Sequence, residues 1–144
     1  MILEGGNMYV ICNPTIFEIQ EMLDCIAKSK DINKYFPQPE NESRAEHLHN
    51  GICLLFYDDN YRPLAYCAFL FSKPKANPFF CAMATEYITW QQMLAIRKAL
   101  IRFADNEFKR GVSVYILNDA VIPLVETSGF KQSKRNKKIY FRRK

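Results

Sequence analysis

Three apolar runs in the middle of the chain, joined by short turn sequences, constrain the fold more than any other feature. The runs are Ile52–Tyr57 (ICLLFY), Leu64–Phe71 (LAYCAFLF) and Phe79–Ile88 (FFCAMATEYI). An Asp-Asp-Asn cluster separates the first two, and a segment with two prolines separates the second from the third. Apolar runs of this length, bounded by turn residues, are typical of β-strands. The pattern therefore predicts an antiparallel hairpin that a third strand extends into a meander.

Amphipathic helices and further strands are predicted on both sides of this meander. Apolar residues recur every three or four positions from Ile16 to Ile26, and a capping box of Thr89 and Gln92 opens a longer helix that we expect Gly111 to end. Two short helices are expected over residues 43–49 and from 118 or 119 to 128, and further strands at Met8–Cys12, Val112–Leu117 and Ile139–Arg142. Because 144 residues suit one domain, we expect a single α/β (α+β) domain over residues 1–144.

Charge is distributed unevenly along the chain, although the net charge is only +5. Residues 1–60 hold four basic and ten acidic side chains, whereas residues 131–144 hold eight basic and no acidic ones. Such a basic segment suits an anionic partner, such as phosphate, nucleic acid or a phosphorylated cofactor. A solvated terminal strand is the alternative interpretation.

The five cysteines, Cys12, Cys25, Cys53, Cys67 and Cys81, predict neither a disulfide framework nor a zinc site, because their number is odd and no pair has Cys-x-x-Cys spacing. We expect reduced core thiols in a cytoplasmic compartment. His47 and His49 are two residues apart on a predicted helix and so face apart, which predicts no shared metal. No apolar run approaches the roughly 18 residues that span a bilayer, and we expect no membrane partner.

The segment from Val112 to Phe130 reads VSVYILNDAVIPLVETSGF. It resembles the C-terminal motif of the Gcn5-related N-acetyltransferases (GNAT), in which a strand ending in Asn is followed by A-I-x-L-Y-E-K-x-G-F. The residues that occupy the offsets of this motif are Asn118, Ile122, Leu124, Glu126, Gly129 and Phe130. The order of the preceding elements is also similar to this family, over nearly the whole chain. The resemblance implies a GNAT-like mixed, mostly antiparallel sheet flanked by helices.

The same resemblance implies acetyl-CoA as the cosubstrate. Family members hold its pyrophosphate with Q/R-x-x-G-x-G/A at the start of the long helix, where exposed N–H groups and the helix dipole stabilise negative charge. In this chain the matching run extends from Gln92 to Arg97, in which Gln92 fits the motif and Ala95 is a small substitute. Arg97 departs from the motif, and its guanidinium either closes the site or contacts a phosphate. With Asn118, these are the predicted cofactor-binding residues.

The resemblance implies fewer catalytic residues. In the family, the acceptor amine attacks the thioester directly, and a Tyr before the motif's Glu often protonates the departing thiolate. Val125 occupies that position here and cannot donate a proton, which leaves water, Tyr115 or Tyr87 as substitutes. Glu86, at the predicted end of the third strand, is the candidate general base, and a plain surface carboxylate is the alternative interpretation.

Two functions from different classes follow. In the first, the chain is a coenzyme A-dependent N-acetyltransferase that acts on a small-molecule or protein amine, and the acidic 31–50 region suits a cationic acceptor. In the second, it is a catalytically inactive GNAT-fold binding or structural protein, similar to some small proteins of bacteriophages. The basic C-terminal tail, in which Tyr140 and Phe141 lie among basic residues, would then contact nucleic acid or a protein partner.

Overall fold

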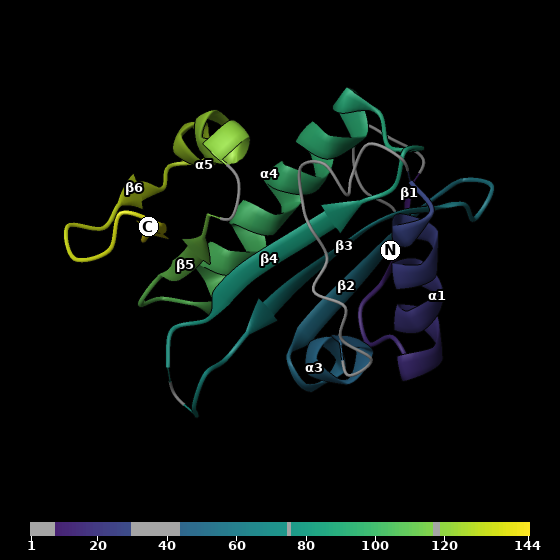
Figure 1. Cartoon of the computed structure of the whole chain (residues 1–144), viewed down its shortest axis with the longest axis horizontal. Coiled ribbons are helices and arrows are strands. Elements are labelled where there is room, and N and C mark those ends of the chain that lie inside the picture. The colour runs from purple at the N-terminus through teal and green to yellow at the C-terminus, as the bar shows by residue number, and fades with distance from the viewer. Residues whose placement is uncertain (1–7, 30–43, 75, 117–118) are drawn as a thin grey trace.

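The computed structural model describes residues 8–29, 44–74, 76–116 and 119–144 (Figure 1). The strands are β1 (Met8–Ile11), β2 (Ile52–Asp58), β3 (Pro63–Leu70), β4 (Phe79–Ala84), β5 (Val112–Tyr115), β6 (Lys131–Gln132) and β7 (Ile139–Arg142). The helices are α1 (Ile16–Ala27), α3 (Arg44–Asn50), α4 (Trp90–Glu107) and α5 (Ile122–Thr127), and a 3-10 turn, η1, covers Asp119–Val121. None of the described helices is long and apolar enough to cross a bilayer.

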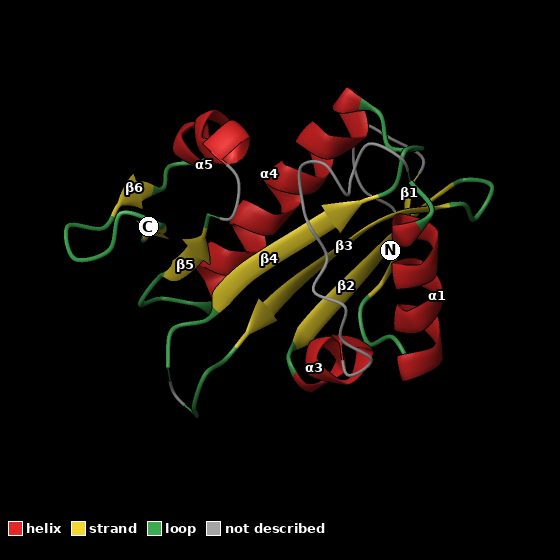
Figure 2. Cartoon of the chain, viewed as in Figure 1, coloured by secondary structure: helices red, strands yellow, loops and turns green. Residues whose placement is uncertain are grey.

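The strands form one sheet in the order β1-β2-β3-β4-β5-β7-β6. Every neighbouring pair is antiparallel except β4 and β5, which run parallel. Helices α1 and α3 lie on one side of the sheet and α4 lies on the other (Figure 2). The predicted class, a mixed and mostly antiparallel sheet flanked by helices, is therefore confirmed.

Each side of the sheet has its own apolar core. Beneath α1 and α3 the core includes Ile19, Leu48 and Tyr66, all fully buried. Beneath α4 it includes Phe56, Phe69 and Leu100, and the ring of Phe69 contacts several other phenylalanine rings. The alternation of side chains along β2 and β3 supplies both cores at once.

The capping box predicted for the long helix is present. The Gln92 amide donates to Thr89 Oγ1 at 3.1 Å, and the Thr89 amide donates to Gln92 Oε1 at 2.9 Å. The predicted end of this helix is wrong, because α4 stops at Glu107 rather than at Gly111. Gly111 has a φ of 109° and lies against the Phe141 ring and the Arg142 carbonyl, so its backbone meets β7 where a side chain would not fit.

One further boundary differs from the prediction and affects the site. Strand β4 ends at Ala84, so Glu86 lies in the turn beyond the strand. The strand predicted at Ile139–Arg142 is confirmed as β7, which lies between β5 and β6 in the sheet. Tyr140 is buried there, and the Arg142 guanidinium pairs with Asp105 of α4.

Candidate functional site

The parallel pair β4 and β5 separates soon after it begins. Its register contains only two residue pairs, Phe79 with Ser113 and Phe80 with Val114. The Ser113 amide donates to the Pro78 carbonyl at 3.0 Å. The main-chain N–H and C=O groups of the even-numbered residues of β4 therefore face β5. By alternation, the main chain of Ala82 and Ala84 faces the same side, beyond the last paired residue. Among the described residues, the second half of β4 thus has no strand paired to this edge.

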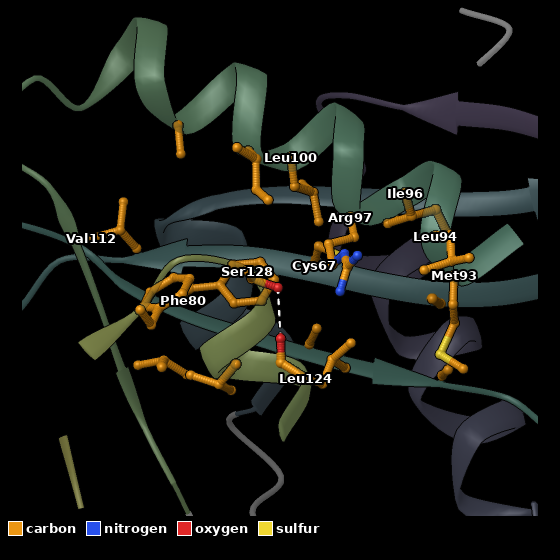
Figure 3. Close-up of a pocket in the computed structure, with 18 of the residues that line it drawn as sticks. Cys67, Phe80, Met93, Leu94, Ile96, Arg97, Leu100, Val112, Leu124 and Ser128 are labelled. Carbon is orange, nitrogen blue, oxygen red and sulfur yellow. Dashed lines mark hydrogen bonds between the residues drawn. The ribbon is translucent and has the colours of Figure 1, made fainter. Parts of the chain in front are cut away.

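An apolar cleft of about 240 Å³ opens where the two strands diverge. Its walls come from β3, β4, β5, α4 and α5, and Figure 3 shows the side chains that converge on it. Phe80 and Ala82 line the strand side, Met93 and Leu100 the α4 side, and Val125 the α5 side. None of the described residues that line the cleft is a carboxylate, a histidine or a tyrosine. The cleft can therefore hold a largely apolar chain and exclude water from it, but it offers little acid–base chemistry.

Arg97 is a charged side chain in this cleft, pointing inward from α4 (Figure 3). Its Nη1 donates to Thr127 Oγ1 at 3.1 Å, so the side chain bridges α4 and α5. Thr127 Oγ1 in turn donates to the Leu124 carbonyl at 3.0 Å. A neutral, exposed hydroxyl is a weak partner for a guanidinium, which leaves the positive charge of Arg97 available to an anion.

The base of the cleft is fixed by Arg142 of β7. Its guanidinium pairs with Asp105 of α4, and its Nε donates to the Ser128 carbonyl at 3.0 Å. The hydrogen bond from Arg142 holds the pKa of the Asp105 carboxyl below its ordinary value. The Ser128 hydroxyl donates to the Leu124 carbonyl at 2.7 Å, which is drawn as a dashed line in Figure 3. These contacts connect α4, α5 and β7 around one end of the cleft.

The predicted cofactor-binding residues occupy different places along α4. Gln92 is in the first turn, where its side chain closes the capping box. Ala95 is half-buried and packs against the core, one turn further along, and Arg97 lies in the cleft. Asn118 lies outside the described residues. The run from Gln92 to Arg97 is therefore brought to one helix, but only its first residue stands at the helix N-terminus.

The main-chain amides at the start of α4 were not among the cofactor-binding residues predicted from the sequence. Helix α4 begins at Trp90, and the amides of Gln92 and Met93 already bond to Thr89. The first-turn amides of Trp90 and Gln91 precede these, and such N–H groups have no partner inside a helix. The capping box was the signal that could have placed them, because it fixes the first residue of the helix.

The predicted proton-transfer residues do not line the cleft. Glu86 is exposed two residues beyond β4, and its amide donates to Ser29 Oγ at 3.1 Å. Tyr87 is 47% exposed with the Arg62 guanidinium 5.1 Å from its ring centre. Tyr115 is 45% exposed at the end of β5.

A further cation lies on the other face of β3 and β4. Arg44 Nη2 donates to the Tyr66 hydroxyl at 3.1 Å, and no described residue accepts a hydrogen bond from its buried Nε. Burial raises the pKa of Tyr66 to about 12, so this partner is neutral. Burial also raises the pKa of the neighbouring Cys81 thiol, and Arg44 opposes that shift. Arg44 at the start of α3 carried no sequence signal, because its partners are distant in the chain.

No model of a protein family matches the chain, and no curated protein matches it. Several solved structures do match it over almost their full length. A GNAT acetyltransferase from Staphylococcus aureus Mu50 has a TM-score of 0.69 at 11% identity, covering 94% of this chain and 98% of that one. An acetyltransferase from Agrobacterium tumefaciens C58 has a TM-score of 0.71 at 9% identity, covering 100% and 94%.

A third similar structure contains ligands. Spermidine N-acetyltransferase from Vibrio cholerae, in complex with CoA and spermine, has a TM-score of 0.63 at 11% identity and covers 94% of this chain and 92% of that one. Identities this low show the fold alone. The chain has the GNAT fold.

Proposed function

We propose that this GNAT-fold chain is an N-acyltransferase that moves an acetyl group from acetyl-CoA to an amine. The observation that carries the proposal is the cleft between β4 and β5, where strand pairing stops after two residue pairs and an apolar cavity begins. The likeness to acetyltransferases, including one in complex with CoA, supports the same function. The cosubstrate itself supplies the reactive thioester.

The residues present suit the different parts of coenzyme A. The amide groups of its pantetheine arm can pair with the open main chain of Ala82 and Ala84, as an added strand would. Its phosphates suit the first-turn amides of Trp90 and Gln91 together with the guanidinium of Arg97. The apolar walls described above exclude water from the space between these two ends.

Positioning, rather than acid–base chemistry in the cleft, is the main contribution of the protein to this reaction. Direct attack forms the C–N bond of the amide and breaks the C–S bond of the thioester, and the ammonium proton must leave before attack. We assign its removal to Glu86, the carboxylate that follows β4 in the chain, acting from solvent. Since Val125 replaces the family's tyrosine, water accepts the second proton that the nitrogen loses after attack and supplies the proton that the departing thiolate takes up.

The acceptor is an amine, either a small molecule or a protein side chain. The similar structure that contains spermine supports small amines. Arg44, whose described partners are neutral, adds a positive charge on the face of β4 away from α4. An acceptor screen should therefore include polyamines and also amino acids, which carry both an amine and a carboxylate.

Calorimetric titration of acetyl-CoA into the purified protein at moderate salt tests the proposal. We expect saturable binding in the micromolar range, and weaker binding of dephospho-CoA because it lacks one phosphate. A screen of amines with a free-thiol assay then tests turnover. An absence of heat at high cofactor concentration, with the protein folded, would contradict the proposal.

The second candidate is a binding protein that has kept the fold without catalysis. The observation that favours it is Arg97, which crosses the cleft to Thr127 where family members have small residues.

For either function, a reducing, cytoplasmic compartment suits the chain, because all five cysteines are free. Burial raises the pKa of Cys53 to about 12 and that of Cys67 well above its ordinary value, so these two thiols are unreactive.

A further inference from the structure

The C-terminal part of the sheet has one face that no described helix covers. Val112 and Val114 of β5 line the cleft on the α4 side, so Ser113 and Tyr115 face the opposite side. The apolar core beneath α1 and α3 contains residues from β1 to β4 and none from β5, β6 or β7. Figure 1 shows the same arrangement, with α1 and α3 far from β5. This part of the sheet therefore presents an open face.

The register shows which side chains share this open face. Tyr115 pairs with Ile139, Ser113 pairs with Phe141, and Phe141 pairs with Lys131. Residues directly opposite each other in neighbouring strands point to the same side of a sheet. Tyr115 is 45% exposed, whereas Phe141 is half-buried, with its ring against the main chain of Gly111. Tyr115 and Phe141 are diagonal neighbours on adjacent strands, and the Cα atoms of such neighbours are about 7–8 Å apart.

A basic hairpin borders the open face. Residues 131–144 hold eight basic side chains and no acidic one, and of these Arg142 is paired with Asp105. The turn between β6 and β7 is exposed and holds Lys134, Arg135, Lys137 and Lys138. An extended chain also returns Arg143, two residues beyond Phe141, to the same side. Lys131 and Arg143 therefore share the open face with the two aromatic side chains, and the turn adds four cations beside it.

Hydrogen bonds fix the shape of this hairpin. Ser133 Oγ accepts from the Arg135 amide at 3.2 Å, and Asn136 Oδ1 accepts from the Lys138 amide at 3.0 Å. The Gln132 side chain donates to the Lys137 carbonyl at 2.9 Å across the turn. A turn that is ordered before binding holds its charges in place at a smaller entropic cost than a free tail.

We infer that the open face of β5, β7 and β6, with its basic hairpin, binds single-stranded nucleic acid. Exposed aromatic side chains on a sheet can stack on unpaired bases, while surrounding lysines and arginines neutralise the phosphates. A membrane surface requires a larger apolar area than Tyr115 and Phe141 supply. The surface lies on the side of β5 away from the cleft, so it does not depend on the proposed acetyl transfer.

Fluorescence anisotropy of a labelled 12-nucleotide single-stranded RNA, with the full chain at several salt concentrations, tests this inference. We expect Lys134→Gln with Arg135→Gln to weaken binding about tenfold and to reduce the slope of log affinity against log salt by about 1.4. The matched control is Lys98→Gln with Arg102→Gln, which removes two exposed cations from α4. This control should bind as the unchanged chain does.

Tyr115 separates base stacking from simple charge attraction. We expect Tyr115→Ala to weaken RNA binding about tenfold with an unchanged salt slope, and Tyr115→Phe to bind normally. Heparin, which has charge but no bases, should bind Tyr115→Ala and the unchanged chain equally. Equal RNA binding by the unchanged chain, Tyr115→Ala and Tyr115→Phe would overturn the inference. So would tighter binding to vesicles that contain phosphatidylserine than to RNA, because the partner would then be a lipid surface.

Discussion

Arg97 is the single residue on which the two candidate functions differ most. Its guanidinium lies in the cleft, and its assigned partner, Thr127 Oγ1, is neutral and exposed. If coenzyme A occupies the cleft, its phosphates are better partners than this hydroxyl, since charge-assisted hydrogen bonds are the stronger kind. We therefore expect Arg97→Ala to weaken acetyl-CoA binding about tenfold, measured by calorimetry.

Arg102→Ala is the matched control for this change, because Arg102 is exposed on the same helix and does not line the cleft. Its affinity for acetyl-CoA should stay within about twofold of the unchanged chain, since exposed charges outside a site contribute little. Tighter binding by Arg97→Ala would show that the side chain obstructs the cleft, and would favour the non-catalytic candidate.

Val125 offers a test of the chemistry rather than of binding. It lines the cleft from α5 and stands where the family motif has a tyrosine that often acts as an acid. We expect Val125→Tyr to raise kcat at least tenfold, because a positioned acid typically contributes 10² to 10⁴-fold. Val125→Phe adds the ring without the hydroxyl and should give no such gain. Equal rates for the two variants would show that protonation of the thiolate does not limit turnover.

Single residues were predictable from the sequence where their partners are close in the chain. Thr89 and Gln92 are three residues apart, so their capping box follows from spacing alone. Arg142 and Asp105 are 37 residues apart, and only the folded sheet brings them together. The hydrogen bond between Arg44 and Tyr66 was not predictable for the same reason, since these residues are 22 positions apart.

At the scale of elements, the Arg142–Asp105 ion pair joins β7 to α4. Its hydrogen bond lowers the pKa of Asp105 in the folded state. A carboxyl of lowered pKa stabilises the fold above its unfolded pKa, about 4, and this contribution is lost as the pH falls through the folded value. We expect Asp105→Asn to reduce the free energy of unfolding at pH 7 by about 1–2 kcal/mol.

Urea denaturation at several pH values measures this effect. The unchanged chain should lose stability below about pH 4 more steeply than Asp105→Asn does, because the variant no longer has the carboxyl that titrates there. Glu107→Gln is the matched control, since Glu107 is an exposed carboxyl on the last turn of the same helix. An acid limb of equal slope for Asp105→Asn and the unchanged chain would contradict a stabilising role for the pair.

Long elements were predicted better than short ones. The three apolar runs became β2, β3 and β4 because each supplies buried side chains, and apolar pattern is the signal that sequence carries. Strand β6 has two exposed polar residues, Lys131 and Gln132, so nothing in its sequence distinguishes it from a loop. Its pairing with β7, the strand predicted at Ile139–Arg142, forms a hairpin that the sequence did not indicate.

At the scale of the whole molecule, the sheet consists of two parts joined by a narrow connection. Strands β1 to β4 pair over four to six residues each, whereas β4 and β5 share only two residue pairs. The order of elements was predictable from alternation and from the motif of residues 112–130. The separation of β4 from β5 was not predictable, because the pattern of apolar and polar side chains does not show where main-chain pairing between two strands ends. The cleft exists because of that separation.

We therefore expect a cofactor in this cleft to form hydrogen bonds with the open main chain of β4, and hydrogen exchange can detect these bonds. In the free protein, the amides of Ala82 and Ala84 face the unpaired side and should exchange rapidly, whereas the amide of Cys81, which faces β3, should be protected. Saturating acetyl-CoA should slow exchange at Ala82 and Ala84 at least tenfold and leave Cys81 unchanged. If the two alanine amides exchange equally fast with and without bound cofactor, coenzyme A does not pair with β4. Slowed exchange at those two positions would show that the ligand acts as the missing neighbour of the strand.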